Sequence, residues 1–372
     1  ELSEDATVTR NAGFTLGGLS LANKTFTLGS ATTDLTLVDN SSSSSSNSSP
    51  SGTFATKLAD LTYISSGAAN ITTGTTITST GGKFSFAKGI KMNGATISLT
   101  DTTLAVGESL TKTGGTLTLN QADLELTSDL TITSDAAMAF DTFTPNAKDL
   151  ELASSSTAEV SLGNLNIASS SVDVKGGTLN ITGGSVGANG SLEIGGSGTL
   201  KLGGNLAVTG TINLNNGATT TFAGNKIDVS GGTLKLAGTH SLNSITTNDQ
   251  TKLQINNSAN VSRTDSGTST VGSLTYIQSG GSGSLSLSVA NMGLTVASAT
   301  QVSGASLNHS NGILTFQSAP SLSNSSSLSV SNGELVLANG VTVNGSSLQL
   351  TASKFKPTGS VSVTNGGTFA LN

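Results

Sequence analysis

The chain contains few side chains of the kinds that usually carry out catalysis or bind metals. It has 2 histidines, no cysteine and 22 carboxylates among 372 residues. His240 and His309 lie far apart in the sequence, and neither is flanked by the carboxylates that would complete a metal site. We therefore expect each histidine to be a solvated turn residue. The lack of cysteine excludes disulfide bonds and thiolate metal sites.

Carboxylates are most frequent between residues 101 and 173, where 11 of them face only Lys112 and Lys148. Asp123, Glu125 and Asp129 would be the natural candidates for a cation site there, because calcium prefers oxygen ligands. The stretch has no twelve-residue calcium loop, and the glycine-rich segments of the chain lack the aspartate of calcium-binding nonapeptides. We therefore expect a solvated acidic face, with no bound metal or cofactor.

A carbohydrate-active enzyme is the main enzymatic alternative. Glycoside hydrolysis needs two carboxylates at acid–base distance, and such enzymes commonly stack sugar rings on aromatic side chains. The chain has only 2 tyrosines and no tryptophan, and its two arginines, Arg10 and Arg263, lie away from the acidic stretch. We expect no enzymatic activity. The lack of a Lys/Arg cluster also argues against nucleic-acid binding.

The elements that would position such residues follow a short repeat. The phrase Gly-Gly-Thr-Leu-x-Leu or a close variant occurs at 114–120, 176–182, 231–237 and 366–372. Glycine or asparagine recurs with a spacing of 21 residues, as in Gly94 and Gly115, Gly177 and Gly198, Asn311 and Asn332, and Asn344 and Asn365. Such a short period indicates one small structural unit stacked many times.

Within one repeat, segments of about four residues alternate apolar and polar side chains, which is the pattern of a strand with one buried face. The side chains expected to point inward are Leu179, Ile181, Leu192, Ile194, Leu200, Leu202, Ile212, Leu214, Ile227, Val229, Leu234 and Leu236. The sequence therefore predicts an all-β fold, a β-solenoid (β-helix) with about 21 residues and three short strands per coil. A β-sandwich, the competing fold, would lack the fixed period.

We expect a single β-solenoid over residues 1–372, with insertions at 40–52 and 135–149. The first insertion is rich in serine, and we expect it to protrude as a flexible loop; a glycosylated or partner-contacting loop is the alternative. The second contains Met138, Phe140 and Phe143. We expect it to be closed by local hydrophobic contacts, with a hinge or docking site as the alternative.

The GGTLxL phrase, followed by short turns and a recurrent Gly-Asn, resembles the repeats of autotransporter passengers and filamentous haemagglutinin-like adhesins of Gram-negative bacteria. The resemblance implies an exported protein at the cell surface, either a fibre or an adhesin that binds a host-cell, matrix or glycan receptor. The chain departs from an autotransporter because 366–372 is still solenoid repeat and not a translocator barrel. No apolar run is long enough for a transmembrane helix. We interpret Glu1 as a processing boundary within a longer precursor.

Charge is distributed unevenly. Residues 1–186 carry 9 basic and 17 acidic side chains, whereas residues 187–372 carry 7 and 5. We expect an acidic first strand to meet a basic last coil head to tail, and such a contact does not close, so it would generate a filament. The expected contact residues are Glu1, Leu2, Glu4, Asp5, Ala6, Val8, Lys354, Lys356, Val361, Val363, Phe369 and Leu371. The alternative is that both ends are cuts in a longer solenoid.

Overall fold

The architecture comes from a computed structural model, which describes residues 88–153, 155–277, 285–298 and 300–372. Before residue 88 it describes only the residues of strands β1 to β9. The serine-rich segment 40–52 lies outside the described residues. In the part of the chain that is described, all regular structure is β-strand. No helix among those residues is long and apolar enough to cross a membrane.

The chain divides into two compact units, each made of short strands. The N-terminal unit comprises Glu1–Gly184, Ser197–Gly203 and Thr219–Thr221, and the C-terminal unit comprises Ser185–Gly196, Gly204–Ala218 and Phe222–Asn372. The strands of the N-terminal unit are β1 (Ala6–Val8), β2 (Phe14–Leu16), β3 (Thr25–Leu28), β4 (Leu35–Asp39), β5 (Thr53–Thr56), β6 (Leu61–Ser65), β7 (Ala69–Thr72), β8 (Thr76–Thr80), β9 (Lys83–Phe86), β10 (Ile90–Asn93), β11 (Thr96–Thr100), β12 (Thr103–Thr113), β13 (Thr116–Asn120), β14 (Asp123–Ser134), β15 (Met138–Thr144), β16 (Leu150–Leu152), β17 (Glu159–Ile167), β18 (Ser171–Val174), β19 (Thr178–Ile181), β22 (Thr199–Leu202) and β25 (Thr219–Thr221). The strands of the C-terminal unit are β21 (Ser191–Ile194), β23 (Leu206–Val208), β24 (Thr211–Leu214), β26 (Ile227–Asp228), β27 (Thr233–Ser241), β28 (Ile245–Thr246), β29 (Lys252–Ser262), β30 (Thr268–Val271), β31 (Ser273–Ile277), β32 (Leu285–Ala290), β33 (Gly293–Val296), β34 (Gln301–Ser303), β35 (Ala305–Ser310), β36 (Ile313–Phe316), β37 (Ser321–Ser323), β38 (Ser327–Ser331), β39 (Glu334–Leu337), β40 (Val341–Asn344), β41 (Ser347–Thr351), β42 (Lys354–Pro357), β43 (Val361–Thr364) and β44 (Thr368–Leu371). Strand β20 (Gly184–Val186) contains the boundary between two of these segments.

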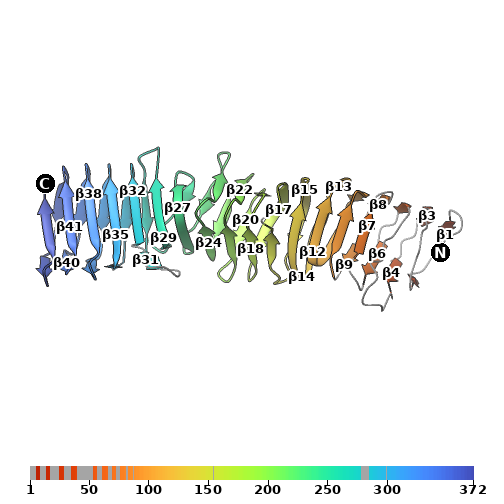
Figure 1. Ribbon diagram of the computed structural model, residues 1–372, viewed down its shortest axis with the longest axis horizontal. Coiled ribbons are helices and arrows are strands. Elements are labelled where there is room, and N and C mark those ends of the chain that lie inside the picture. The colour runs from red at the N-terminus through yellow and green to blue at the C-terminus, as the bar shows by residue number, and fades with distance from the viewer. Residues whose placement is uncertain are drawn as a thin grey trace. The chain divides into compact units, whose positions relative to one another are not determined.

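Most strands pair in parallel with the corresponding strand of the next coil. In the C-terminal unit, Leu307 is the partner of Leu328, and Leu328 is the partner of Leu348, so partners lie 20 or 21 residues apart. Strands β32, β35, β38 and β41 lie side by side in this way (Figure 1). One coil there consists of β38, β39 and β40, which belong to three different sheets. The predicted β-solenoid is therefore confirmed.

The inner faces of the strands form a dry aliphatic core. All twelve side chains that the alternation predicted to be inward, from Leu179 to Leu236, are 1 % exposed or less. Their alternating neighbours lie at the surface, as the burial pattern of β21, β24 and β19 shows. Parallel pairing places apolar side chains directly above one another, so each coil covers the apolar face of its neighbour.

Asparagine and glycine shape the turns of the described coils. Asn311, Asn332 and Asn365 have positive φ values of 55°, 50° and 50°, a conformation that asparagine tolerates better than most residues. The side-chain amide of Asn365 donates to the Oδ1 of Asn344, 2.6 Å away on the preceding coil. The 21-residue recurrence of asparagine thus reflects a turn that is repeated and hydrogen-bonded from coil to coil.

The segment predicted as an insertion at 135–149 contributes a strand to the ladder. Strand β15 pairs with β14 at Leu124↔Phe143 and with β17 at Met138↔Val160. Met138, Phe140 and Phe143 are buried, in agreement with the expected hydrophobic contacts. Over Met138–Thr144 the segment therefore continues the solenoid, because its alternating Met138 and Phe140 fill the inner positions that Leu and Val occupy elsewhere.

We predict that Leu234→Asp will lower the free energy of unfolding by about 3–5 kcal/mol, because a carboxylate there has no partner to offset its burial. Leu234 is stacked between Ile212 and Leu253. The control is Lys252→Asp, on the exposed side of β29. It should change the stability by less than about 0.5 kcal/mol. Thermal unfolding followed by circular dichroism measures both, and equal effects would contradict the assignment of the inner face.

Candidate functional site

Both histidines are buried on strands, so the expectation that they are solvated turn residues is wrong. His240 lies in β27, and its Nε2 is 2.8 Å from the carbonyl oxygen of Ala237. His309 lies in β35, where it follows Ala305 and Leu307 on the inner side, and its Nε2 is 3.0 Å from the carbonyl oxygen of Met292. Each ring satisfies a backbone carbonyl inside the coil, which is a structural role.

The carboxylates of the acidic stretch form ion pairs between coils. Glu125 lies 2.5 Å from Lys83, which is 42 residues earlier in the chain. Glu151 pairs with Lys175 at 2.5 Å, and the backbone N–H of Asp149 donates to Asp129. Among the described residues, no three His, Asp or Glu side chains are grouped closely enough to hold a metal ion. These carboxylates therefore connect successive coils.

Lys112 is a charged residue inside the coil that inspection of the sequence did not single out. It stands at an inner position of β12, directly after Met92 in the stack of coils. Its Nζ donates to the carbonyl oxygen of Gly114 at 2.9 Å and lies 3.6 Å from Asp135. The backbone N–H of Gly114 binds Asp135 at 2.8 Å and lowers the pKa of that carboxyl. Through these contacts Lys112 fixes the turn at Gly114.

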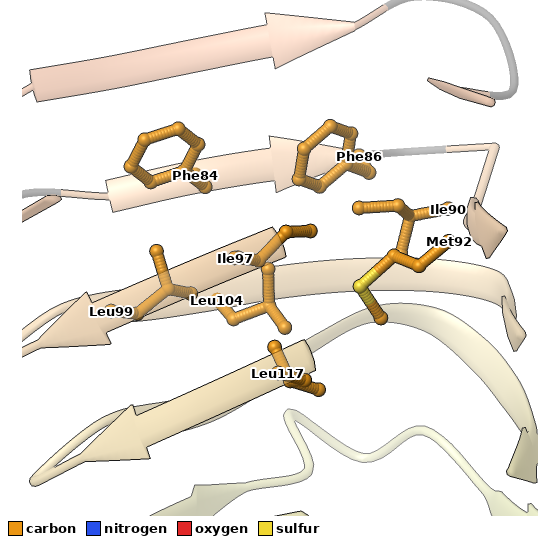
Figure 2. Close-up of a pocket in the computed structure, with 8 residues that line it drawn as sticks. All are labelled: Phe84, Phe86, Ile90, Met92, Ile97, Leu99, Leu104 and Leu117. Carbon is orange, nitrogen blue, oxygen red and sulfur yellow. The ribbon is translucent and has the colours of Figure 1, made fainter. Parts of the chain in front are cut away.

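A small apolar space lies near β9 in the described core of the N-terminal unit. Figure 2 shows that it lies among the side chains of successive strands, lined by Phe84, Phe86, Ile90, Met92, Ile97, Leu99, Leu104 and Leu117. Its volume is about 10 Å³, which is close to the least that admits a single water molecule. It is an imperfection of core packing and offers no room for a ligand.

The last coil of the C-terminal unit carries the edge that the sequence predicted as a contact surface. Strands β42, β43 and β44 each pair with only one other strand in the described part of the chain, namely β39, β40 and β41. Each therefore has one edge without a strand partner. Such edges are templates for the addition of another strand.

The apolar side chains of this coil are open on the same side. Val363 follows Val343 in the stack but is 41 % exposed compared with 0 %, and Leu371 follows Leu350 but is 61 % exposed compared with 1 %. Phe355, which the sequence analysis did not include, meets Phe369 across the coil with ring centroids 5.2 Å apart. We call the surface formed by Phe355, Val361, Val363, Phe369 and Leu371 the terminal coil face.

The charged residues of the predicted contact are only partly placed by the structure. Lys356 pairs with Glu334 at 2.8 Å, whereas Lys354 has no ion-pair partner among the described residues. Glu1, Leu2, Glu4 and Asp5 lie outside the described residues. Ala6 and Val8 belong to β1, which pairs with β3 and is the first strand of its sheet. The contact between the two ends therefore stays a prediction.

Comparison with known proteins assigns neither a family nor a function to this chain. The chain matches no protein family, no curated protein and no solved structure at a significant level. The likeness to autotransporter passengers and adhesins therefore rests on the repeated phrase alone, and the fold rests on the structure.

We predict that His309 makes the C-terminal unit less stable at acidic pH. Burial lowers the pKa of His309, although its hydrogen bond to the Met292 carbonyl acts in the opposite direction. A histidine with a lowered pKa takes up its proton on unfolding, so its contribution is retained above about pH 6.5 and lost as the pH falls. Between about pH 7 and pH 5, the melting temperature should fall by roughly 1–4 °C more in the wild type than in His309→Leu. Parallel pH profiles would contradict this role.

Proposed function

We propose that this protein is an exported structural element of the cell surface, and that copies of it join head to tail through the terminal coil face into a filament. The main support is the parallel stacking of coils that share one repeated shape, since the same pairing can join a coil of another copy. The scarcity of charge, the lack of cysteine and the resemblance of the repeats to surface fibres support export.

The joining partner that best fits this face is the first coil of a second copy. The strand pairings within both units are parallel, so a strand added to β44 in the same direction continues the existing hydrogen-bonding pattern. Strand β1 has the sequence Ala-Thr-Val, the alternation of apolar and polar residue types found in the other strands. Because the two joined surfaces differ, the contact leaves a free end and repeats without closing.

The charged residues near the two ends of the chain support the same head-to-tail orientation. Lys354 is exposed beside the terminal coil face, and the first residues of the chain include Glu1, Glu4 and Asp5. An exposed ion pair contributes little to affinity, but complementary charge favours the correct encounter and disfavours face-to-face contact of two identical ends. The proposed assembly should therefore weaken as the ionic strength rises.

A carbohydrate-active enzyme is the alternative function. Such an enzyme would present two carboxylates in one groove. Among the described residues, the carboxylates nearest to basic side chains form separate pairs, such as Glu125 with Lys83 and Glu159 with Lys201. The hydrogen bonds of Glu159 to Lys201, Asn180 and Ser161 outweigh burial and lower its pKa, which is unsuited to a general acid. We therefore favour the structural role.

We predict that Val363→Asp will abolish self-association of the full chain. The charge would have to be buried between two stacked coils, whereas in the free protein it stays in water. Ile313→Asp is the matched control, because Ile313 is also exposed but its strand, β36, is paired on both sides. Light scattering over a range of concentrations and electron microscopy should show filaments for the wild type and Ile313→Asp only.

Removing residues 1–10 provides the complementary test, since it should leave a folded chain that no longer polymerises. The stacking proposal is wrong if the wild type stays monomeric at high concentration, or if Val363→Asp forms the same filaments as the wild type.

A further inference from the structure

Two neighbouring coils of the C-terminal unit separate locally. The backbone N–H of Leu242 donates to the Ser262 carbonyl at 2.9 Å, and the N–H of Gly272 donates to the Thr251 carbonyl at 2.8 Å. Between these two connections, β28 pairs with β26 and β30 pairs with β33, but β28 and β30 do not pair with each other. One sheet ends at β28 and another begins at β30, so the ladder is interrupted on this side of the solenoid.

A polar cavity occupies the interruption. Its volume is about 170 Å³. It is lined by Lys226, Asn243, Ile245, Thr246, Thr247, Arg263, Thr268 and Ser269. An engineered protein cavity of about 150 Å³ holds one benzene molecule, so the space is comparable to a single six-membered ring. It is therefore much larger than a packing imperfection and smaller than a site for a drug-sized ligand.

The charges at the cavity leave one positive charge without a partner. Arg263 donates to Asp265 through Nε at 2.8 Å and Nη2 at 2.6 Å, and through Nη1 to the Leu242 carbonyl at 3.0 Å. These hydrogen bonds hold the pKa of Asp265 well below its usual range, so Asp265 stays ionised and balances Arg263. Lys226 is exposed and has no ion-pair partner among the described residues.

The other lining groups are mostly neutral donors and acceptors. Thr247 Oγ1 is buried and has no hydrogen-bond partner among the described residues. The side chain of Ser269 is also buried. A buried hydroxyl without a partner destabilises the free protein, and a ligand hydroxyl would satisfy it. Ile245 is 2 % exposed and belongs to the core, and Asn243 is bonded to Thr264 through both of its amide atoms.

We propose that this cavity binds one monosaccharide unit that carries a single anionic group. The anionic group would lie at Lys226 and at the two N–H groups of Arg263 that Asp265 and Leu242 leave unused, since a guanidinium has five. The ring hydroxyls would bind the threonine and serine side chains. A simple inorganic anion would leave most of the neutral groups unused. This inference is independent of filament formation.

Calorimetric titration of the full chain with five probes tests the proposal. Glucuronate and glucose 6-sulfate should bind. Glucose, which lacks the anionic group, and inorganic sulfate, which lacks the sugar ring, should bind at least about tenfold more weakly at the same ionic strength. Binding of a uronate oligosaccharide would identify a chain end as the source, and binding of the monosaccharide alone would identify a free sugar acid. If inorganic sulfate binds as tightly as glucuronate, or if no sugar binds, the proposal is wrong.

Two variants locate the binding in this cavity. Lys226→Gln should weaken glucuronate binding about tenfold or more, since a charge-assisted hydrogen bond is lost. Lys252→Gln removes the same charge from an exposed site on β29 and should leave binding unchanged. Thr247→Val should weaken binding while the melting temperature stays equal or rises, because the unpaired hydroxyl is gone. Unchanged affinity in both Lys226→Gln and Thr247→Val would overturn the proposal.

Discussion

Parallel backbone pairing between successive coils is the constraint on which the rest of this structure depends. It fixes each residue directly above the residue about 20 positions earlier, so most inner positions are apolar in coil after coil, as in the stack of Leu307, Leu328 and Leu348. It also repeats the turns, so that Asn291 and Asn311 adopt the same place, with φ values of 57° and 55°, and bind each other. A single coil could not bury its own inner face, and stability therefore comes from stacking.

The same constraint determines where polar chemistry can occur. Where stacking is regular, charged residues bind across coils, as Lys83 does with Glu125, and buried polar groups such as His309 bind backbone carbonyls. These contacts engage Lys83, Glu125 and the Nε2 of His309 within the stack. One place where pairing between neighbouring coils stops is between β28 and β30, and the polar cavity lies there. The proposed ligand site lies in that interruption.

The sequence predicted most of the regularly stacked solenoid, because the alternation of apolar residues and the spacing of the repeats are local properties. Leu234 and Val229 were assigned correctly from period-2 alternation alone. The same alternation would have placed His309 inside, two residues after Leu307, but the general tendency of histidine to be exposed was given more weight. The cavity at Lys226 and Arg263 could not be predicted, because it depends on how far two coils separate. The filament contact stays a prediction, since nothing in a repeat specifies its partner.

The register between coils is the central claim, and a disulfide bond tests it most directly. The chain has no cysteine, and the hydroxyl oxygens of Ser306 and Ser327 lie 2.8 Å apart on paired positions of β35 and β38. In the Ser306→Cys/Ser327→Cys variant, mild oxidation of the folded protein should therefore form an intramolecular disulfide bond. In Ser306→Cys/Ser329→Cys, the Cα atoms would be about 8 Å apart, which is too far for a bond. Mass spectrometry of the digested protein distinguishes them, and cross-linking of the second pair in place of the first would contradict the account.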